Sequence, residues 1–367
     1  MKKLLCIVGG MNAGGAETFL MKIFRTLDKS KYRMDFCVAI NYKGYYDDEI
    51  ESSGGVIHHV PPKTKNPFSS FEAIRKIVRE GNYNSVLRIS QNSMSCIDLV
   101  SARFGGASIL GFRSSNSGTC GSKFEDIAHF FFKPIANMVA NVKIAPSTEA
   151  AEFMFGKMNI ESGKVEILHN GLDVERFKFE KKKRDNIRKI LNVEEKFVIG
   201  HIGRFNKQKN HEFLIRVFSK IIKVNPNAHL VLVGEGNTES IVRSLVIENN
   251  LEKNVTFLGV RSDVESLMMA FDVLFLPSIF EGMPNVAIEA QCTGLPCKLS
   301  DTITKEAKIT DLVEFIGLND YDAWAKSATS IMLNGKMIDR EQYSSQVKCQ
   351  GYSIQDVSDR FIQLFYN

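Results

Sequence analysis

The chain has 367 residues, 44% of them hydrophobic and 24% charged. This composition is typical of soluble globular proteins, and the length suits two α/β domains rather than one core. The formal net charge of +5 comes without a basic stripe interleaved with aromatic residues, which excludes a nucleic-acid partner and favours anionic ligands or an anionic membrane surface. No apolar stretch is long enough to span a membrane, so we expect a cytoplasmic protein with at most peripheral contact at the inner face of the cell membrane.

The first half of the chain opens on an apolar run that ends in glycines, which predicts a buried strand rather than a signal peptide. From there on, short apolar runs alternate with helix-period segments, the pattern of βαβ units in parallel sheets. The predicted strands of this half cover 4–10, 34–40, 85–90, 108–113, 142–147 and 164–170. The predicted helices cover 16–27, 71–80, 97–104 and 148–155.

A second series starts with its own strand after a polar, strand-free segment at 170–185. Its predicted strands cover 197–204, 228–236, 254–260, 273–278 and 295–300, and its predicted helices cover 211–223, 239–249, 263–270 and 284–293. We therefore predict an α/β protein of two doubly wound Rossmann-like domains, residues 1–170 and 171–351, that face a central cleft. A C-terminal helix at 352–367 either closes the second domain or packs back on the first.

Two features of the composition are interpreted as structural. The basic run 181–184 is expected to be a solvated helix or linker face, with contact to lipid headgroups as the alternative. The seven cysteines are odd in number and scattered, which predicts neither a disulfide framework nor a zinc site. Several lie in apolar runs, where a cysteine behaves as a small core residue.

The loop after the first predicted strand, Val8 to Glu17, is rich in glycine. Glycines such as Gly14 and Gly15 let a backbone approach a ligand closely, and the start of the following helix favours an anion. The spacing is not that of a dinucleotide fingerprint or a P-loop. A tight turn without a ligand remains an equal alternative.

Two cations follow the strand at 197–204. Arg204 and Lys209 precede a helix whose expected cap is Asn210. Cations beside the start of a helix could clamp a diphosphate, because they neutralise its charge where water is partly excluded. An ordinary solvated loop is the alternative.

Two glutamates, Glu281 and Glu289, flank the start of the predicted helix 284–293. Pro284 suits the first turn of that helix, and the free backbone N–H groups of Asn285 and Val286 would point at an anion. Glu289, one turn on, could accept hydrogen bonds from a ribose. The alternative is a glutamate on the solvent side of an amphipathic helix.

Polar residues also follow the strand at 108–113, where Arg113, Ser114, Ser115 and Asn116 could contact an acceptor or a donor phosphate, with loop solvation as the alternative. His129 lies in the strongly apolar stretch 124–138, which includes three consecutive phenylalanines. Core packing is the preferred interpretation of that stretch and of its histidine. A surface that meets lipid and a catalytic base are the respective alternatives.

Other chemistries lack their motifs. No G-x-S-x-G or H-E-x-x-H sequence occurs, and the adjacent His58 and His59 would point to opposite faces of a strand. The single D-x-D, Asp320 to Asp322, is typical of a loop that starts a helix rather than of a metal–nucleotide site.

Together, the glycine-rich loop, the Arg204 and Lys209 pair, the VGEG sequence and the E-x7-E segment 281–289 resemble the retaining glycosyltransferases of family 4. These enzymes have the GT-B fold. The resemblance covers nearly the whole chain and is most specific in the second half, where 276–307 is especially similar to the capsular and exopolysaccharide branch. It implies a nucleotide diphosphate sugar, expected to be a UDP-sugar, as donor and a glycan or polyprenyl-linked acceptor. No metal or other cofactor is required.

The resemblance also implies roles for the residues already singled out. Arg204 and Lys209 bind the diphosphate and stabilise the charge that grows on it, and Glu281 contacts sugar hydroxyls. The donor-binding residues are Gly14, Gly15, Val260, Arg261, Asn285, Val286 and Glu289. The two glycines pack against the donor, and the backbone of Val260 and Arg261 frames the base. The amides of Asn285 and Val286 bind the phosphates, and Glu289 binds the ribose.

One departure concerns the acceptor side. Relatives often have a histidine near the end of the strand at 108–113, where this chain has Arg113, Ser114 and Ser115. Arg113, Ser115 and His129 are therefore the candidate acceptor-side residues. Two alternatives to a transferase remain open, a nucleotide-sugar 2-epimerase of the same fold and a protein that binds a nucleotide sugar without catalysis.

Overall fold

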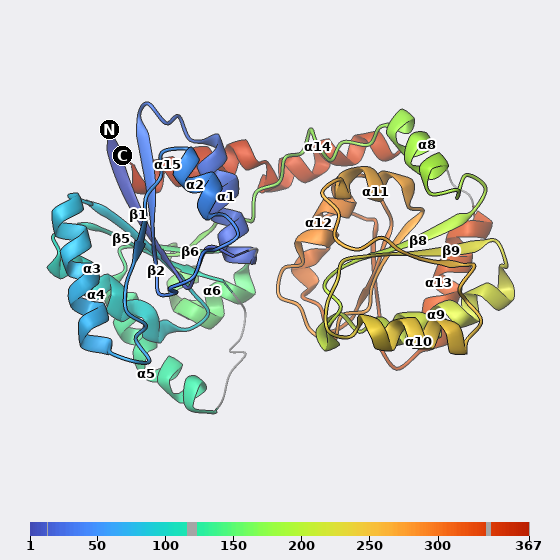
Figure 1. The fold of residues 1–367 in the computed structure, drawn as a ribbon, viewed down its shortest axis with the longest axis horizontal. Helices are drawn as coiled ribbons and strands as arrows, with labels where there is room; N and C mark the ends of the chain where they lie inside the picture. Colours follow the sequence, from blue (N-terminus) through green and yellow to red (C-terminus); the bar gives the residue numbers. More distant parts are fainter. Residues whose placement is uncertain (13, 116–122, 335–338, 367) are drawn as a thin grey trace. The chain divides into compact units, whose positions relative to one another are not determined.

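The computed structural model describes residues 1–12, 14–115, 123–334 and 339–366. The chain divides into two compact units (Figure 1). Unit 1 consists of Met1–Gly171 and Ser353–Asn367, and unit 2 of Leu172–Tyr352. Each unit is an α/β domain built on one parallel sheet, which confirms the predicted fold class.

The sheet of unit 1 has seven strands in the order β3-β2-β1-β4-β5-β6-β7. The strands are β1 (Lys2–Val8), β2 (Tyr32–Val38), β3 (Ile57–His59), β4 (Ser85–Ser90), β5 (Ile109–Ser114), β6 (Val142–Ala145) and β7 (Glu166–Ile167). The helices are α1 (Gly15–Thr26), α2 (Asp47–Ser52), α3 (Pro67–Gly81), α4 (Ile97–Phe104), α5 (Lys123–Val139), α6 (Thr148–Phe155) and α7 (Lys157–Glu161). A 3-10 turn, η1 (Ser93–Cys96), precedes α4.

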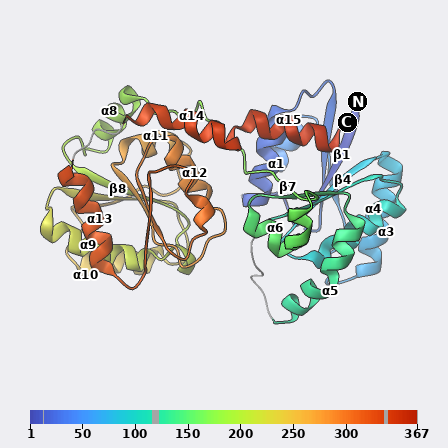
Figure 2. The same cartoon turned by 180° about the vertical axis from the view of Figure 1, so that it is seen from behind.

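Helices cover both faces of this sheet, as the alternation of buried residues along β1 requires. Leu4 and Cys6 point into one core with α1, and Leu5 and Ile7 point into the other with α3 and α4. The C-terminal helix α15 (Ile354–Phe365) packs beside α1 in the first of these cores (Figure 2). Its Phe361 is fully buried and contacts Phe19 edge-on.

The sheet of unit 2 has six strands in the order β10-β9-β8-β11-β12-β13. The strands are β8 (Phe197–Ile202), β9 (Ala228–Val233), β10 (Val255–Phe257), β11 (Val273–Leu276), β12 (Cys297–Ser300) and β13 (Val313–Ile316). The helices are α8 (Lys181–Ile190), α9 (His211–Val224), α10 (Glu239–Glu248), α11 (Val264–Ala270), α12 (Asn285–Cys292), α13 (Tyr321–Asn334) and α14 (Tyr343–Val347). Short turns are η2 (Lys207–Lys209), η3 (Lys305–Ala307), η4 (Arg340–Gln342) and the π-helical η5 (Lys348–Tyr352).

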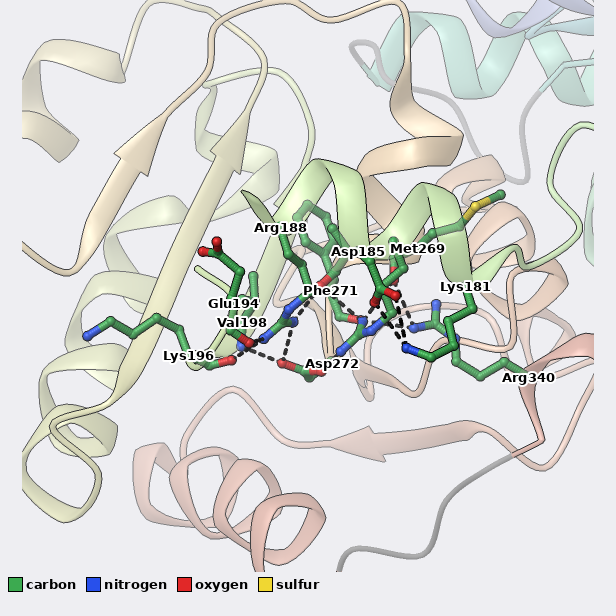
Figure 3. A network of polar contacts seen from close by, with 12 residues as sticks. Lys181, Asp185, Arg188, Glu194, Lys196, Val198, Met269, Phe271, Asp272 and Arg340 are labelled. Carbon is green, nitrogen blue, oxygen red and sulfur yellow. Dashed lines mark hydrogen bonds and ion pairs between the residues drawn. The ribbon is translucent and has the colours of Figure 1, made fainter. Parts of the chain in front are cut away.

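The basic run 181–184 lies on α8 with its three lysines exposed, as expected, whereas Arg184 joins a network of polar contacts that also includes Arg188 and Arg340 (Figure 3). Arg184 pairs with Asp272 and donates to the carbonyls that end α11, and Arg188 and Arg340 donate to the same segment. The carbonyls at a helix end have no intrahelical donor, so the guanidinium groups satisfy them and tie α8 to α11. The lysine Lys181 of the run pairs only locally, with Asp185 one turn on.

The stretch 124–138 also differs from its preferred interpretation. It forms α5, and its apolar residues occupy two faces rather than one buried face. Phe130 and Phe131 are 73% and 68% exposed, whereas Phe132 packs against the core that α3 and α4 cover. Core packing is therefore wrong for the outward face of α5.

Further expectations concern absences. Of the cysteines, Cys120 lies outside the described residues, and the others are free, with all but Cys349 buried. No cluster of metal-ligating side chains occurs among the described residues. None of the described helices is long and apolar enough to cross a membrane.

Candidate active site

The predicted residues of unit 2 follow strands that end at the same edge of one sheet. Strands β8, β11 and β12 are neighbours and run parallel, so the loops after Ile202, Leu276 and Ser300 emerge side by side. Polar side chains at the carboxyl edge of an open α/β sheet are where ligands of such folds bind. The structure brings together there Lys209, Glu281 and the start of α12.

Lys209 and Glu281 form an ion pair between two of these loops. The Lys209 ammonium contacts the Oε1 atom of Glu281, and the two side chains are 16% and 12% exposed. The hydroxyl of Ser278, which is fully buried, donates to the same oxygen over 2.7 Å. A cation and a carboxylate that are both largely shielded from water interact more strongly than a surface pair.

Backbone hydrogen bonds hold the two loops at a fixed distance. The Ile279 N–H donates to the Gln208 carbonyl over 2.8 Å, and the Gln208 side chain returns a bond to the Phe280 carbonyl over 2.8 Å. The side chain of Asn206 caps η2 by accepting from the Lys209 N–H. These bonds fix the position of the Lys209 backbone relative to the loop that carries Glu281. No sequence pattern predicted that Gln208 would bridge the two loops.

The loop after β9 lies against the loop after β8 because it carries glycine. A Cβ at Gly234 would lie 2.2 Å from the Gly203 carbonyl oxygen, and its φ of +128° is one that only glycine adopts easily. A Cβ at Gly236 would meet the Phe205 carbonyl in the same way. The VGEG sequence, to which no role was assigned above, therefore supports the backbone on which Arg204 stands.

Two histidines, His201 and His211, pack against each other behind Lys209. The rings of His201 and His211 are 4.4 Å apart, and His211 stacks on Phe205 at 4.0 Å. Both are almost fully buried, and burial lowers the pKa of His211 to about 4 and the pKa of His201 well below its usual range. Both imidazoles are therefore neutral at pH 7 and add no charge to the site.

Asn210 lies at the cap position of α9, as expected, but it caps through its backbone. It adopts the left-handed conformation, makes no side-chain cap, and accepts the Leu214 N–H on its carbonyl. The first-turn N–H groups of α9 therefore receive no cap from the Asn210 side chain.

The start of α12 presents the geometry expected of an anion site. Pro284 is the residue just before the helix rather than its first residue, and its carbonyl accepts the first helical bond, from Ala287. Asn285 and Val286 then occupy the first turn, whose N–H groups have no acceptor within the helix. Glu289, half-buried, lies one turn further on. It is on neither a fully solvated nor a fully buried face.

The other predicted donor residues are on the surface of the same edge. Arg204 follows β8 and is exposed. Val260 follows β10 and is 68% exposed. The Arg261 guanidinium pairs with Asp263 across 2.7 Å.

In unit 1, Gly14 and Gly15 lie at the start of α1. Gly14 occupies the cap position with extended backbone, and a Cβ there would meet the Glu17 carboxylate at 2.4 Å. Gly15 has open space where a side chain would be. Burial raises the pKa of Glu17 from its usual range. Ala13, within the same loop, lies outside the described residues.

Arg113 is buried rather than presented to solvent. Only 1% of it is exposed, its guanidinium lies 3.7 Å over the Phe19 ring, and one Nη donates to Asn170 over 2.7 Å. Burial lowers its pKa to about 9. Ser115 is half-buried and its N–H donates to Ser90. Asn116 lies outside the described residues.

His129 has both ring nitrogens engaged. Its Nδ1 accepts from the Ser93 N–H over 3.1 Å, so Nε2 carries the proton and donates to the Phe153 carbonyl over 3.1 Å. The ring also stacks on Phe153 at 4.2 Å. These contacts, and a pKa that burial lowers from its usual range, describe a packed neutral histidine rather than a poised base.

Taken together, unit 2 holds two cations, a shielded carboxylate and a helix start at one strand edge. This combination can bind a diphosphate and stabilise negative charge that develops on it, with a carboxylate left to accept hydrogen bonds from hydroxyls.

Comparison with known proteins identifies what this arrangement is similar to. The sequence profile of the family Glycosyl transferases group 1 matches residues 182–348, which is most of unit 2. The chain is 31% identical over 341 residues to the putative glycosyltransferase EpsF of Bacillus subtilis, covering 91% of this chain and 89% of that protein.

Two further similarities extend this result. The UDP-Gal:alpha-D-GlcNAc-diphosphoundecaprenol alpha-1,3-galactosyltransferase of Escherichia coli is 31% identical over 50% of this chain and 49% of its own length. The crystal structure of HepE from Anabaena in complex with UDP aligns over 99% of both chains with a TM-score of 0.80 and 18% identity, a similarity of fold.

Proposed function

The chain belongs to the group 1 glycosyl transferases with the GT-B fold, and from this premise we propose that it transfers a hexose from a UDP-sugar to a glycan or polyprenyl-linked acceptor. We further propose that it does so with retention of anomeric configuration, as a member of family 4, in the synthesis of a capsule or exopolysaccharide. The observation that carries the proposal is the shielded pair of Lys209 and Glu281 beside the start of α12.

The departing nucleoside diphosphate is the chemical problem that this site addresses. As the glycosidic bond breaks, negative charge accumulates on the diphosphate. Lys209 and Arg204, together with the amides of Asn285 and Val286, would stabilise that charge. Because these groups supply the positive charge, we propose that the reaction needs no metal ion. The leaving diphosphate would take the proton of the acceptor hydroxyl, so no protein nucleophile is required.

The remaining contacts would select the donor. Glu281 has a carboxylate oxygen for the hydroxyls of the sugar, and Glu289 lies one helical turn further on for the ribose. The backbone of Val260 and Arg261 would frame the base. Uracil is favoured because HepE was crystallised with UDP and the Escherichia coli relative is named for UDP-Gal. In unit 1, Gly14 and Gly15 would pack against the donor, and Arg113, Ser115 and His129 remain the acceptor-side candidates. The burial of Arg113 and His129 suggests that they act by holding the fold of that side.

A lipid-linked acceptor would bring the protein to a membrane, and α5 offers a surface for it. Ile127, Phe130, Phe131, Ile135 and Met138 recur at helical spacing and are all exposed. An apolar helix face of this kind can bury itself at the boundary of headgroups and acyl chains. The acceptor in the name of the Escherichia coli relative is carried on undecaprenol, which resides in a bilayer. We propose that unit 1 contacts the membrane through this face.

The donor test is a thermal-shift panel of UDP, GDP and ADP, each free and as its glucose, galactose or N-acetylglucosamine derivative. We expect UDP and one UDP-sugar to raise the unfolding temperature. Incubation of that UDP-sugar with lipid extract should then yield a glycolipid whose anomeric configuration, read by NMR, matches the donor. A free epimerised sugar nucleotide formed without acceptor would favour the epimerase, and no stabilisation by any nucleotide would remove the donor site.

The membrane test uses vesicles of phosphatidylcholine with about one third phosphatidylglycerol. Replacing Phe130 and Phe131 together by serine should lower co-sedimentation at least fivefold. Phe68→Ser, which removes a phenylalanine that is 84% exposed on α3, is the matched control and should have no effect. Equal loss in both variants would refute a specific surface on α5.

A further inference from the structure

Among the described residues, the protein holds the carboxylate of Glu281 through one of its two oxygens. Lys209 and the Ser278 hydroxyl both contact Oε1, and none of the described residues donates to Oε2. The side chain is 12% exposed, so water has little room to compete for the second oxygen. The geometry therefore separates an oxygen that the protein holds from an oxygen that is available to a ligand.

Ser278 is itself fixed by the strand beside it. The Ser278 carbonyl accepts hydrogen bonds from the hydroxyls of Ser300 and Thr302, which lie at the end of β12 and are themselves 2.9 Å apart. Ser278 is 0% exposed, and Ser300 is also fully buried. A buried hydroxyl with one acceptor in reach has one orientation, because an unmade hydrogen bond there is costly.

The backbone of Glu281 is attached to the same neighbouring segment. Glu281 forms an isolated parallel bridge with Ile303, and the Thr304 N–H reaches its carbonyl at 3.4 Å. With Ile279 and Phe280 bonded to Gln208 on the other side, the loop between β11 and α12 is held from both neighbours. The main chain of Glu281 is thus placed without Ser278. What Ser278 adds is the direction of the carboxylate.

We propose that Ser278 is a positioning residue of the donor site, which holds Oε1 of Glu281 so that Oε2 faces the hydroxyls of the donor sugar. This inference rests on the role proposed above for Glu281. Its consequence is selective: the hydroxyl of Ser278 strengthens binding of a nucleotide sugar but not of the free nucleotide, because only the sugar reaches Glu281. A merely structural serine would affect both ligands alike.

The test is a double-mutant cycle measured by isothermal titration calorimetry on the full chain. The probes are UDP and the UDP-sugar selected in the thermal-shift panel. The variants are Ser278→Ala, Glu281→Ala and the double variant, with Ser327→Ala as the matched loss of a buried hydroxyl, since Ser327 bonds the Trp324 carbonyl in α13. Ser278→Cys, which fills similar space with a weaker donor, serves if Ser278→Ala does not fold.

We expect Ser278→Ala to weaken binding of the UDP-sugar about tenfold and of UDP less than twofold. In the Glu281→Ala background the same change should cost less than twofold for either ligand. Ser327→Ala should leave both affinities unchanged. An equal loss for UDP and UDP-sugar, or an equal loss with and without Glu281, would overturn the role of Ser278 alone. If Glu281→Ala itself left the UDP-sugar affinity unchanged, the proposed role of Glu281 would fail first, and this inference with it.

Discussion

Replacing His211 by phenylalanine should make unit 2 more resistant to acid. His211 is the first residue of α9 and is 2% exposed, stacked on Phe205 and next to His201. Neither of its ring nitrogens has a hydrogen-bond partner among the described residues. Burial, and secondarily the Lys209 cation, lower its pKa to about 4. Phenylalanine keeps the ring and its stacking and removes the group that titrates.

The direction of the effect follows from the difference between the folded and unfolded states. An unfolded histidine has a pKa of about 6.5, so below that pH the unfolded chain binds a proton that the folded chain does not. The contribution of the neutral His211 to the free energy of unfolding is therefore fully present well above pH 6.5. It is lost as the pH falls below 6.5, and the loss is complete near pH 4. Between pH 7.5 and pH 5.0 the loss from His211 is about 2 kcal/mol, or roughly 4 to 8 °C in unfolding temperature for a unit of this size.

The assay is the unfolding temperature of wild type and His211→Phe at pH 7.5 and pH 5.0, followed by circular dichroism at the same ionic strength. The acid-induced decrease should be smaller in the variant by about 4 to 8 °C. His201 remains buried, so the variant still loses some stability in acid. His59→Phe, at an exposed histidine of unit 1, controls for the substitution itself. Equal acid-induced decreases in wild type and His211→Phe would refute the account of a buried neutral imidazole.

Three further outcomes follow from the contacts described above. Arg340→Met removes a part-buried guanidinium that bonds the carbonyls of Met268, Phe271 and Thr293, and should lower the unfolding temperature by about 6 to 12 °C. A decrease of less than 1 °C, the change expected for the exposed Arg103→Met, would contradict this prediction. Gly234→Ala should weaken UDP binding at least tenfold, because the added Cβ would collide with the Gly203 carbonyl. Gly259→Ala is the control, since its backbone is strained at φ +64° but the added Cβ has open space, and it should not weaken binding. Equal UDP affinities in the two variants would contradict the steric argument. Excess EDTA should leave sugar transfer within twofold of its starting rate, and a tenfold loss restored by Mg²⁺ would show that a metal is needed.

The fold was predictable because its strands are short apolar runs that end in glycine or charge. The predicted helices at 97–104 and 148–155 coincide with α4 and α6 residue for residue. Strand β13 was missed because it has only four residues, one of which is the exposed Glu314. The first residue of α12 was placed one position early because Pro284 fits both the first turn and the residue before it.

The candidate site was predictable only to the level of residue types at strand ends. Lys209 contacts Glu281 because β8 and β11 are neighbours in the sheet. The strand order β8-β11-β12 cannot be predicted from local sequence patterns. The contact of Ser278 with Glu281 could not be predicted from the sequence, because a serine after a strand is equally common in a solvated loop. Likewise Arg184, within a basic run, gave no indication that the carbonyls at the end of α11 lie opposite it.

Binding of a nucleoside diphosphate at the strand edge that holds Lys209 underlies the proposed function. It is tested most directly by calorimetric titration of UDP into wild type, Lys209→Met and Lys207→Met, the last an exposed lysine of the same turn. Wild type and Lys207→Met should bind UDP with affinities within twofold of each other. Lys209→Met should bind at least tenfold more weakly, since it loses a charge-assisted contact to phosphate. Equal affinity in all three proteins, or no binding to wild type, would contradict the claim.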